Sequence, residues 1–198
     1  LAILLSITSG TIFYLFNFGY IGTSIATGIF LIQALPRKHK AWGRRTSQIL
    51  VGCYMLLFLG FFNRENMQIE GFFMLLLSGV FAAATMHYLI AKIVGPLIFG
   101  RAWCSYTCWT AMILDLMPYK RPQNKRIRYL GIVRYIYFFI ALSLVLFIWF
   151  ILKKPVEPQS STELYCFIGG NIIYYCLGMI LACSLKDNRA FCKYICPI

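Results

Sequence analysis

The chain has 198 residues, of which 60% are hydrophobic and only 13% are charged, and its mean hydropathy is +0.72. Soluble globular domains carry about 25% charged residues, so this composition excludes an ordinary soluble domain. The formal net charge of +13 does not indicate a nucleic-acid partner, because the basic residues occur in short segments between apolar runs. We therefore expect an all-α integral membrane protein, with residues 1–198 forming a single transmembrane domain in contact with lipid.

Apolar stretches recur along the chain at about the 20-residue length that crosses a bilayer. They predict six transmembrane helices, at residues 1–16, 18–35, 47–62, 71–98, 129–152 and 164–185. The first two are expected to form a hairpin that bends near Asn17-Phe18-Gly19. The fourth is long and is interrupted by Lys92 and by Gly95-Pro96. We expect the Lys92 side chain to extend to the membrane interface.

The basic residues between these helices are distributed very unequally when the sides of the membrane alternate. One face holds residues 36–45, 100–128 and 186–198 with fourteen Lys and Arg, whereas the other holds residues 63–70 and 153–163 with three. Loops rich in Lys and Arg remain in the cytoplasm. The sequence thus predicts a multi-pass protein of the prokaryotic cytoplasmic membrane, with the first face inside.

Two similar strings lie on that predicted cytoplasmic face. RAWCSYTCW (101–109) and RAFCKYICP (189–197) share Arg, Ala, two Cys and Tyr in register, and each follows a helix predicted to run inward. We interpret residues 71–108 and 164–196 as two pseudo-repeated helix–C-x3-C units. Sites in membrane folds are often built at the interface between repeats. The prediction is that Cys104, Cys108, Cys192 and Cys196 supply four thiolates to one centre.

The spacing of these cysteines favours an iron–sulfur cluster over zinc. On a helix, C-x3-C places the Cβ atoms about 5–6 Å apart, which is wide for a zinc ion with bonds of about 2.3 Å to each sulfur. In addition, C-x3-C-P, which Pro197 completes, ends the bacterial ferredoxin motif. Thiols facing the cytoplasm also stay reduced and available to metal. A zinc or copper site with a structural, transport or sensing role remains the alternative, and a scaffold with incidental thiols is a third.

The strings GRAWC-x3-C and NRAFC-x3-CP resemble the paired motifs of the membrane-bound 4Fe-4S-binding proteins. These include the quinol dehydrogenase subunit of periplasmic nitrate reduction and the membrane regulator of nitrous-oxide reduction. The resemblance extends from about residue 71 to the end of the chain. It implies that the four cysteines bind a [4Fe–4S] cluster that passes electrons between the quinone pool and a partner redox subunit. Trp109 departs from the proline usual in the first motif, and a ferredoxin domain often follows the second, beyond residue 198.

Other candidates surround the predicted centre. His87 lies inside the fourth predicted helix, where an ionisable residue is a functional candidate; it could contact a quinone or cofactor, or form an inter-helix hydrogen bond. Arginines near the thiolates would raise the potential of a negatively charged cluster or anchor the chain at the interface. Aromatic residues would shield the site or form an interfacial belt. The candidates for these surrounding positions are Arg101, Arg189, Trp103, Phe191 and Pro197. Asp115 and Asp187 are expected to pair with nearby arginines, and no catalytic residue is predicted.

Overall fold

A computed structural model describes residues 2–80, 83–119, 127, 129–152 and 159–196. This part of the chain is helical and contains no strand. The helices in chain order are α1 (Ala2–Ser9), α2 (Phe13–Ala34), α3 (Lys40–Cys53), the π-helix η1 (Tyr54–Phe62), α4 (Ile69–Leu77), α5 (Ala83–Tyr88), the π-helix η2 (Leu89–Val94), α6 (Gly95–Phe99), α7 (Arg101–Thr107), α8 (Trp109–Leu114), the 3-10 helix η3 (Tyr129–Ile132), α9 (Val133–Leu152), α10 (Ser161–Leu185) and α11 (Ala190–Tyr194).

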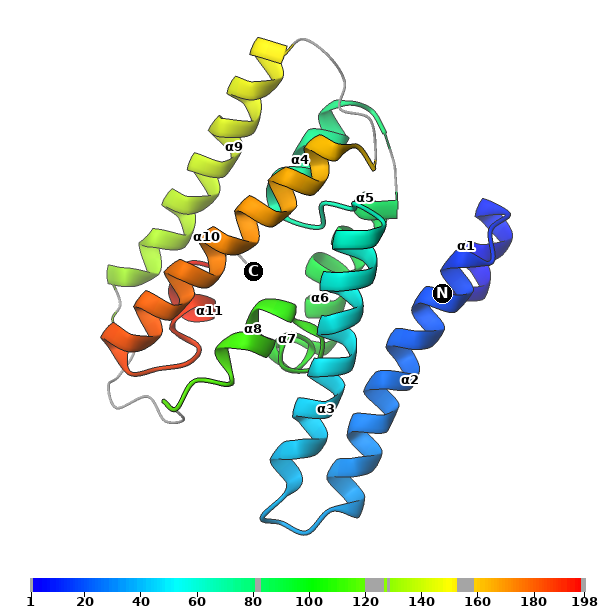
Figure 1. Cartoon of the computed structure of the whole chain (residues 1–198), viewed down its shortest axis with the longest axis vertical. Coiled ribbons are helices and arrows are strands. Elements are labelled where there is room, and N and C mark those ends of the chain that lie inside the picture. The colour runs from blue at the N-terminus through cyan, green and yellow to red at the C-terminus, as the bar shows by residue number, and fades with distance from the viewer. Residues whose placement is uncertain (1, 81–82, 120–126, 128, 153–158, 197–198) are drawn as a thin grey trace.

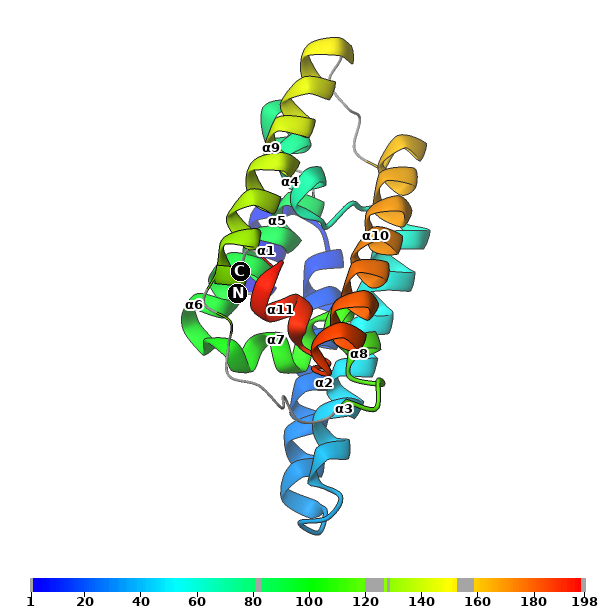
Figure 2. The same cartoon turned by 90° about the vertical axis from the view of Figure 1, so that its left-hand side faces the viewer.

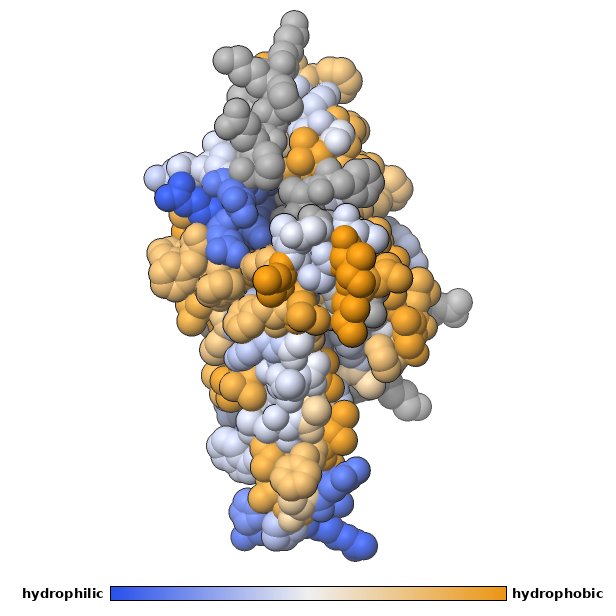
Figure 3. All heavy atoms as spheres, turned by 90° about the vertical axis from the view of Figure 1, so that its right-hand side faces the viewer, coloured by the Kyte–Doolittle hydropathy of each residue, from blue (hydrophilic) through white to orange (hydrophobic). Residues whose placement is uncertain are grey.

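Four helices in the described part are long and apolar enough to cross a membrane. They comprise residues 13–34, 40–62, 129–151 and 161–185. In Figure 1 the α2–α3 turn lies at one end of the molecule, while the start of α10 lies toward the opposite end. The face in Figure 3 is largely apolar, with hydrophilic residues gathered at the tip formed by that turn and in a patch higher up. The prediction of an all-α chain with membrane-length helices is thus supported, while six spans are not confirmed.

The predicted hairpin at the N-terminus is wrong. Residues 17–19 lie inside the continuous helix α2, and the chain turns earlier, between α1 and α2. At that turn Gly10 has a φ of 67°, a conformation that favours glycine because it has no Cβ. The buried side-chain amide of Asn17 hydrogen-bonds His87 from within α2. The first predicted span is consequently reduced to the eight-residue helix α1.

The fourth predicted helix is divided in two, but not at the expected place. α4 ends at Leu77, and Gly79 has a φ of 69°, so the helical direction is lost there. α5, η2 and α6 then follow one another without a gap from Ala83 to Phe99. Gly95-Pro96 does not interrupt this run, because the proline lies in the first turn of α6, where its missing N–H needs no partner. The segment consists of two short helices rather than one span.

Close packing of small residues joins α2 to α3. A Cβ on Gly28 would lie 2.5 Å from the Ser47 Cβ and 2.9 Å from the Gly43 carbonyl oxygen. Ser47 itself is fully buried. Membrane helices commonly approach one another through such residues, because van der Waals packing replaces the hydrophobic effect there.

Gly28→Val should therefore destabilise the protein by about 1–3 kcal/mol, since the added carbon atoms must push the α3 backbone away. Gly22→Val is the matched control on the same helix, because a Cβ on Gly22 meets no atom within 4 Å. Thermal unfolding of both variants in detergent would measure the difference. Equal losses of stability in the two variants would contradict the proposed contact.

The elements that carry the cysteines gather beside the long helices. α11 lies between the lower ends of α9 and α10, with α7 and α8 near it (Figure 2). Leu114 of α8 packs in one buried cluster with Phe191 and Ile195 of the C-terminal segment. Trp109, at the start of α8, belongs to a second buried cluster with Val51, which lies on α3. The fold thereby brings together two segments that are more than 70 residues apart in the sequence.

Candidate metal centre

The two cysteine motifs have similar local structures. Cys104 lies within α7, and Cys108 follows the end of that helix with an extended backbone (φ −81°, ψ 117°). Cys192 lies within α11, and Cys196 follows that helix, where its N–H donates to the Phe191 carbonyl oxygen at 3.0 Å. The two cysteines of a pair consequently do not share one helix face, as the spacing had suggested. Instead, the second thiol of each pair is presented by the chain just beyond a short helix.

Three of the four predicted ligands face a common cavity, which we call the cysteine cavity. It has a volume of about 40 Å³ and is lined by Cys108, Cys192 and Cys196. This space is enough for about three water molecules. The remaining lining residues are Met67, Gln68, Ile69, Tyr88, Lys92, Trp109, Thr110, Tyr137, Tyr174 and Phe191. Cys104 does not line the cavity, although it interacts electrostatically with Cys108 and Cys196.

The surroundings of the thiols oppose their ionisation. Burial raises the pKa of the Cys104 thiol, and the neighbouring Cys108 raises it further. Burial likewise raises the pKa of Cys192, with additional contributions from Cys108 and Cys196. Arg189 and Lys92 lower both pKa values but do not overcome these effects. Because thiolates are the metal-binding form, proton release from this group requires a strongly positive partner such as a metal ion.

The residues fit an iron–sulfur cluster better than a single metal ion. In the described ranges, no three His, Cys, Asp or Glu side chains converge closely enough to hold one metal ion. Mononuclear zinc needs such convergence, whereas the cysteines of a [4Fe–4S] cluster bind separate irons. The lining of the cysteine cavity offers soft sulfur donors and one ammonium group, with neither carboxylate nor imidazole. This donor set matches the ligand preference of iron–sulfur clusters.

Lys92 is a functional candidate that the sequence analysis placed wrongly. Its ammonium nitrogen lies 4.7 Å from the centroid of the Trp109 ring, and the residue lines the cysteine cavity instead of extending to the interface. The signal was present, because an ionisable residue within an apolar run is a functional candidate by default. From the sequence, Trp109 is evident only as a departure from the proline usual in the first motif. It is 3% exposed, and its Nε1–H donates to the Asn171 Oδ1 at 3.1 Å.

The residues predicted to surround the cysteines differ in where they lie. Phe191 is buried and lines the cysteine cavity. Trp103 does not, because its ring fills the space beside Gly95 and its Nε1–H donates to the Ala91 carbonyl oxygen at 2.8 Å. The side chain of Arg101 and the whole of Pro197 lie outside the described part of the chain.

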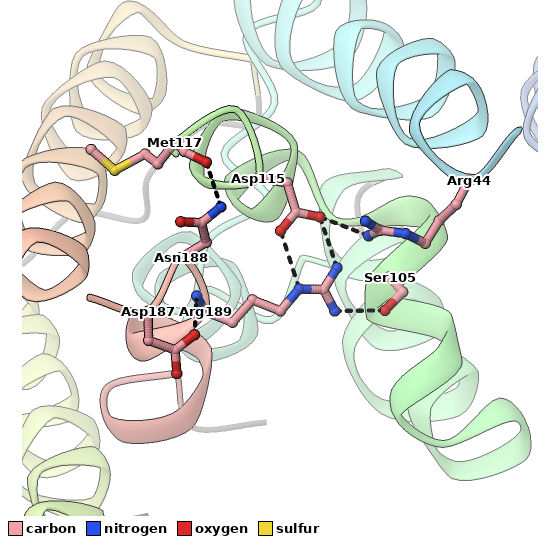
Figure 4. A network of polar contacts seen from close by, with 7 residues as sticks. All are labelled: Arg44, Ser105, Asp115, Met117, Asp187, Asn188 and Arg189. Carbon is pink, nitrogen blue, oxygen red and sulfur yellow. Dashed lines mark hydrogen bonds and ion pairs between the residues drawn. The ribbon is translucent and has the colours of Figure 1, made fainter. Parts of the chain in front are cut away.

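Arg189 connects the two cysteine motifs directly (Figure 4). Its Nη1 donates to the Ser105 hydroxyl at 2.7 Å, and Ser105 lies between the two cysteines of the first motif. Its Nη2 and Nε donate to the two carboxylate oxygens of Asp115 at 2.8 and 3.2 Å. Arg44 donates to the same carboxylate at 2.6 Å. Arg189 therefore acts as a link between motifs, a role that neither of the two predicted alternatives described.

The predicted pairing with arginines is confirmed for Asp115, whereas the ion-pair partner of Asp187 is a lysine. Burial alone would raise the pKa of Asp115, but the hydrogen bonds from Arg189 and Arg44 outweigh it and lower the pKa below its ordinary value. Asp187 forms an ion pair with Lys193 and accepts a hydrogen bond from the Arg189 backbone N–H at 3.0 Å. These contacts hold the turn before α11 against the end of α8.

His87 forms an inter-helix contact, which was one of its two predicted roles. Its ring is 2% exposed, and its Nε2 accepts a hydrogen bond from the Asn17 side-chain amide of α2. Its Nδ1 lies 3.1 Å from a Glu65 carboxylate oxygen. Both ring nitrogens thus face protein groups, and His87 is not among the residues lining the cysteine cavity. Contact with a quinone remains a prediction for this residue.

Comparison with known proteins bears directly on these motifs. Residues 81–128 and 172–198 match the family model described as a 4Fe-4S binding domain. Both cysteine pairs lie within this match. No curated protein and no solved structure matches the chain. The match supports an iron–sulfur protein, and the narrower resemblance to quinol dehydrogenase and nitrous-oxide regulator proteins stays a prediction.

Proposed function

We propose that the chain is a membrane electron-transfer protein whose iron–sulfur centre relays electrons between membrane quinone and a partner redox subunit. The observation that carries this proposal is the meeting of Cys108, Cys192 and Cys196 at one cavity. The matches over both cysteine segments support it further. The fourth ligand in this proposal is Cys104, the remaining motif cysteine, which interacts electrostatically with Cys108 and Cys196.

The residues of the chain would bind the centre and set its surroundings. An iron–sulfur centre supplies one-electron chemistry when bound, while the protein tunes its potential. Lys92 places a positive charge in the cavity that offsets the charge of the thiolates. Trp109 and Phe191, both less than 5% exposed, exclude water from the sulfur atoms. No catalytic acid or base is needed for such a role.

The proposed location is a prokaryotic cytoplasmic membrane with the cysteine motifs on the cytoplasmic side. The four membrane-length helices and the excess of basic residues on one predicted face support it. Membrane quinol is the proposed electron donor, or membrane quinone the acceptor, because both dissolve in the lipid that surrounds the apolar helices. If His87 contacts the quinone ring, either Asn17 or Glu65 must first release an imidazole nitrogen, since both nitrogens face these side chains.

Anaerobic purification of the protein tests this proposal. We expect iron and acid-labile sulfide in equal amounts, together with an electron paramagnetic resonance signal that appears on reduction. Quinol added to the protein in membranes should produce the same signal. Colourless protein that contains only zinc or copper would refute the iron–sulfur centre and favour the alternative metal site. An intact cluster that no quinol reduces and no quinone oxidises would refute only the quinone partner.

A further inference from the structure

A carboxylate and two phenols meet at one end of the cysteine cavity. Glu70 of α4 accepts a hydrogen bond from the Tyr137 hydroxyl of α9, at 2.7 Å to Oε1. The Tyr174 hydroxyl of α10 lies 3.3 and 3.2 Å from the two oxygens of the same carboxylate. The two hydroxyls also contact each other. We call these three residues the Glu70 triad.

The triad separates two cavities. Tyr137 and Tyr174 line the cysteine cavity, whereas Glu70 lines a second cavity of about 60 Å³, which we call the Glu163 cavity. Glu163 and Cys166 are also part of its lining. Each cavity has room for several water molecules. Glu70 thus borders one cavity, while its two hydrogen-bond partners border the other.

The number of protons in the triad is one fewer than its contacts require. Three pairwise contacts connect the carboxylate and the two hydroxyls, but an ionised carboxylate only accepts, and each phenol supplies a single proton. Two protons therefore serve three contacts. A proton on Glu70 would supply the missing hydrogen bond. One more proton in the triad would therefore match the number of its contacts.

The charges around Glu70 indicate when that proton would bind. Lys92 and Tyr88 of the α5–η2 segment line the cysteine cavity together with Tyr137 and Tyr174, and Glu163 and Cys166 of α10 line the Glu163 cavity together with Glu70. Cys196 and Glu70 both act electrostatically on Tyr137. Lys92 is the single basic side chain lining either cavity in the described part. An electron entering beside these thiols adds a negative charge in a medium of low dielectric, where charges interact strongly.

We propose that the Glu70 triad is a proton-uptake site, at which Glu70 binds one proton from water for each electron that a one-electron donor delivers to the centre. This inference rests on the proposed iron–sulfur function and extends it to proton-coupled electron transfer. The electron resides on the centre and the proton on the Glu70 carboxylate, so the net charge of the site does not change. The phenols of Tyr137 and Tyr174 donate to the ionised carboxylate before uptake, and one of them accepts from the protonated carboxyl afterward.

The reduction potential of the centre, measured as a function of pH, tests the proposal. Reduction increases the proton affinity of Glu70, so the potential should fall as pH rises. The potential should shift by about 59 mV for each pH unit, which is the value that a tenfold change in equilibrium constant has for a one-electron couple. Glu70→Gln keeps the size of the side chain but cannot titrate, so its potential should not change with pH. Redox-difference infrared spectra should show a protonated carboxyl band on reduction that Glu70→Gln lacks.

Glu163→Gln is the matched control, because Glu163 lines the same cavity without contacting either phenol among the contacts described. It should retain both the pH dependence and the infrared band. If Glu70→Gln does not fold, Tyr174→Phe provides the second test. It leaves Glu70 with one contact and one phenolic proton, so the reduction potential should depend less steeply on pH. A wild-type potential that is independent of pH, or a dependence that survives in Glu70→Gln, would refute the proton-uptake site. Iron and sulfide measured first separate this result from loss of the cluster itself.

Discussion

Replacing Cys192 with serine should abolish the iron–sulfur centre. Cys192 lies in α11 and faces the cysteine cavity together with Cys108 and Cys196. A serine hydroxyl is a harder and more weakly acidic donor than a thiol, so it does not replace thiolate on iron. Iron, acid-labile sulfide and the resonance signal of the reduced protein should all fall to background levels after anaerobic purification.

Cys176→Ser provides the matched control for this experiment. Cys176 lies on α10 and is exposed, outside both cysteine motifs, so its replacement should leave the cluster content unchanged. A Cys192→Ser protein with full iron content and an unaltered signal would show that Cys192 is not a ligand. Cys104→Ser extends the test to the one motif cysteine that does not line the cavity, and it should also lose the cluster if four motif thiols bind it.

Arg189→Met should produce the second large effect, because it removes the direct link between the two motifs. The guanidinium group donates to Ser105 and to both oxygens of Asp115. Hydrogen bonds to charged groups contribute about 1.5–3 kcal/mol, but the Arg189 side chain is 34% exposed, and solvent screening reduces this contribution. We expect a loss of about 1–2 kcal/mol in stability and a lower cluster content. Thermal unfolding and iron analysis would measure the two effects.

Arg45→Met is a suitable comparison, since Arg45 and Arg189 line one surface cavity together with Asp115. The Arg45 guanidinium, however, lies over the Trp42 ring, 5.6 Å from its centroid. That variant should retain its cluster. In Arg189→Met, the Asp115 carboxylate keeps Arg44 as its partner but loses Arg189. The double variant Arg189→Met with Asp115→Asn also removes that carboxylate charge, so it separates the effect on Asp115 from the loss of the link to Ser105. Recovery of stability without recovery of cluster content would identify the link to Ser105 as the important contact. Full cluster content in Arg189→Met itself would refute a positioning role for Arg189.

The parts of the fold that sequence predicted well are those governed by local composition. The predicted helix at 164–185 lies within α10, and 129–152 corresponds to η3 and α9, because both segments are uniformly apolar over the length of a bilayer. The break at Gly79 was missed since Gly95-Pro96 looked the stronger interruption. Gly95-Pro96 does not break the helix, because the register of α6 places the proline in its first turn. That register is not visible in a pattern of apolar residues.

The candidate site was predictable where it depends on repeated residues and unpredictable where it depends on packing. The duplicated string identified three cavity-lining cysteines and Phe191. The positions of Glu70 and Tyr137 depend on which helices meet, so no local motif indicates them. The pseudo-repeats are similar only locally, since the 25-residue helix α10 precedes one motif and the short run α5–η2–α6 precedes the other.

The division of the fourth predicted span has a consequence for biogenesis. With nine residues and a rise of 1.5 Å per residue, α4 is about 14 Å long, which is less than half the thickness of the hydrocarbon core. Its end amides would lack partners if it met lipid alone, so it must wait for neighbours that bury them. α9 and α10, which pack against α4, are synthesised later. We therefore expect α4 to reach its packed position only after α9 and α10 have been synthesised. A cluster bound by Cys108, Cys192 and Cys196 would likewise form after these helices, because two of the three cysteines follow α10 in the chain.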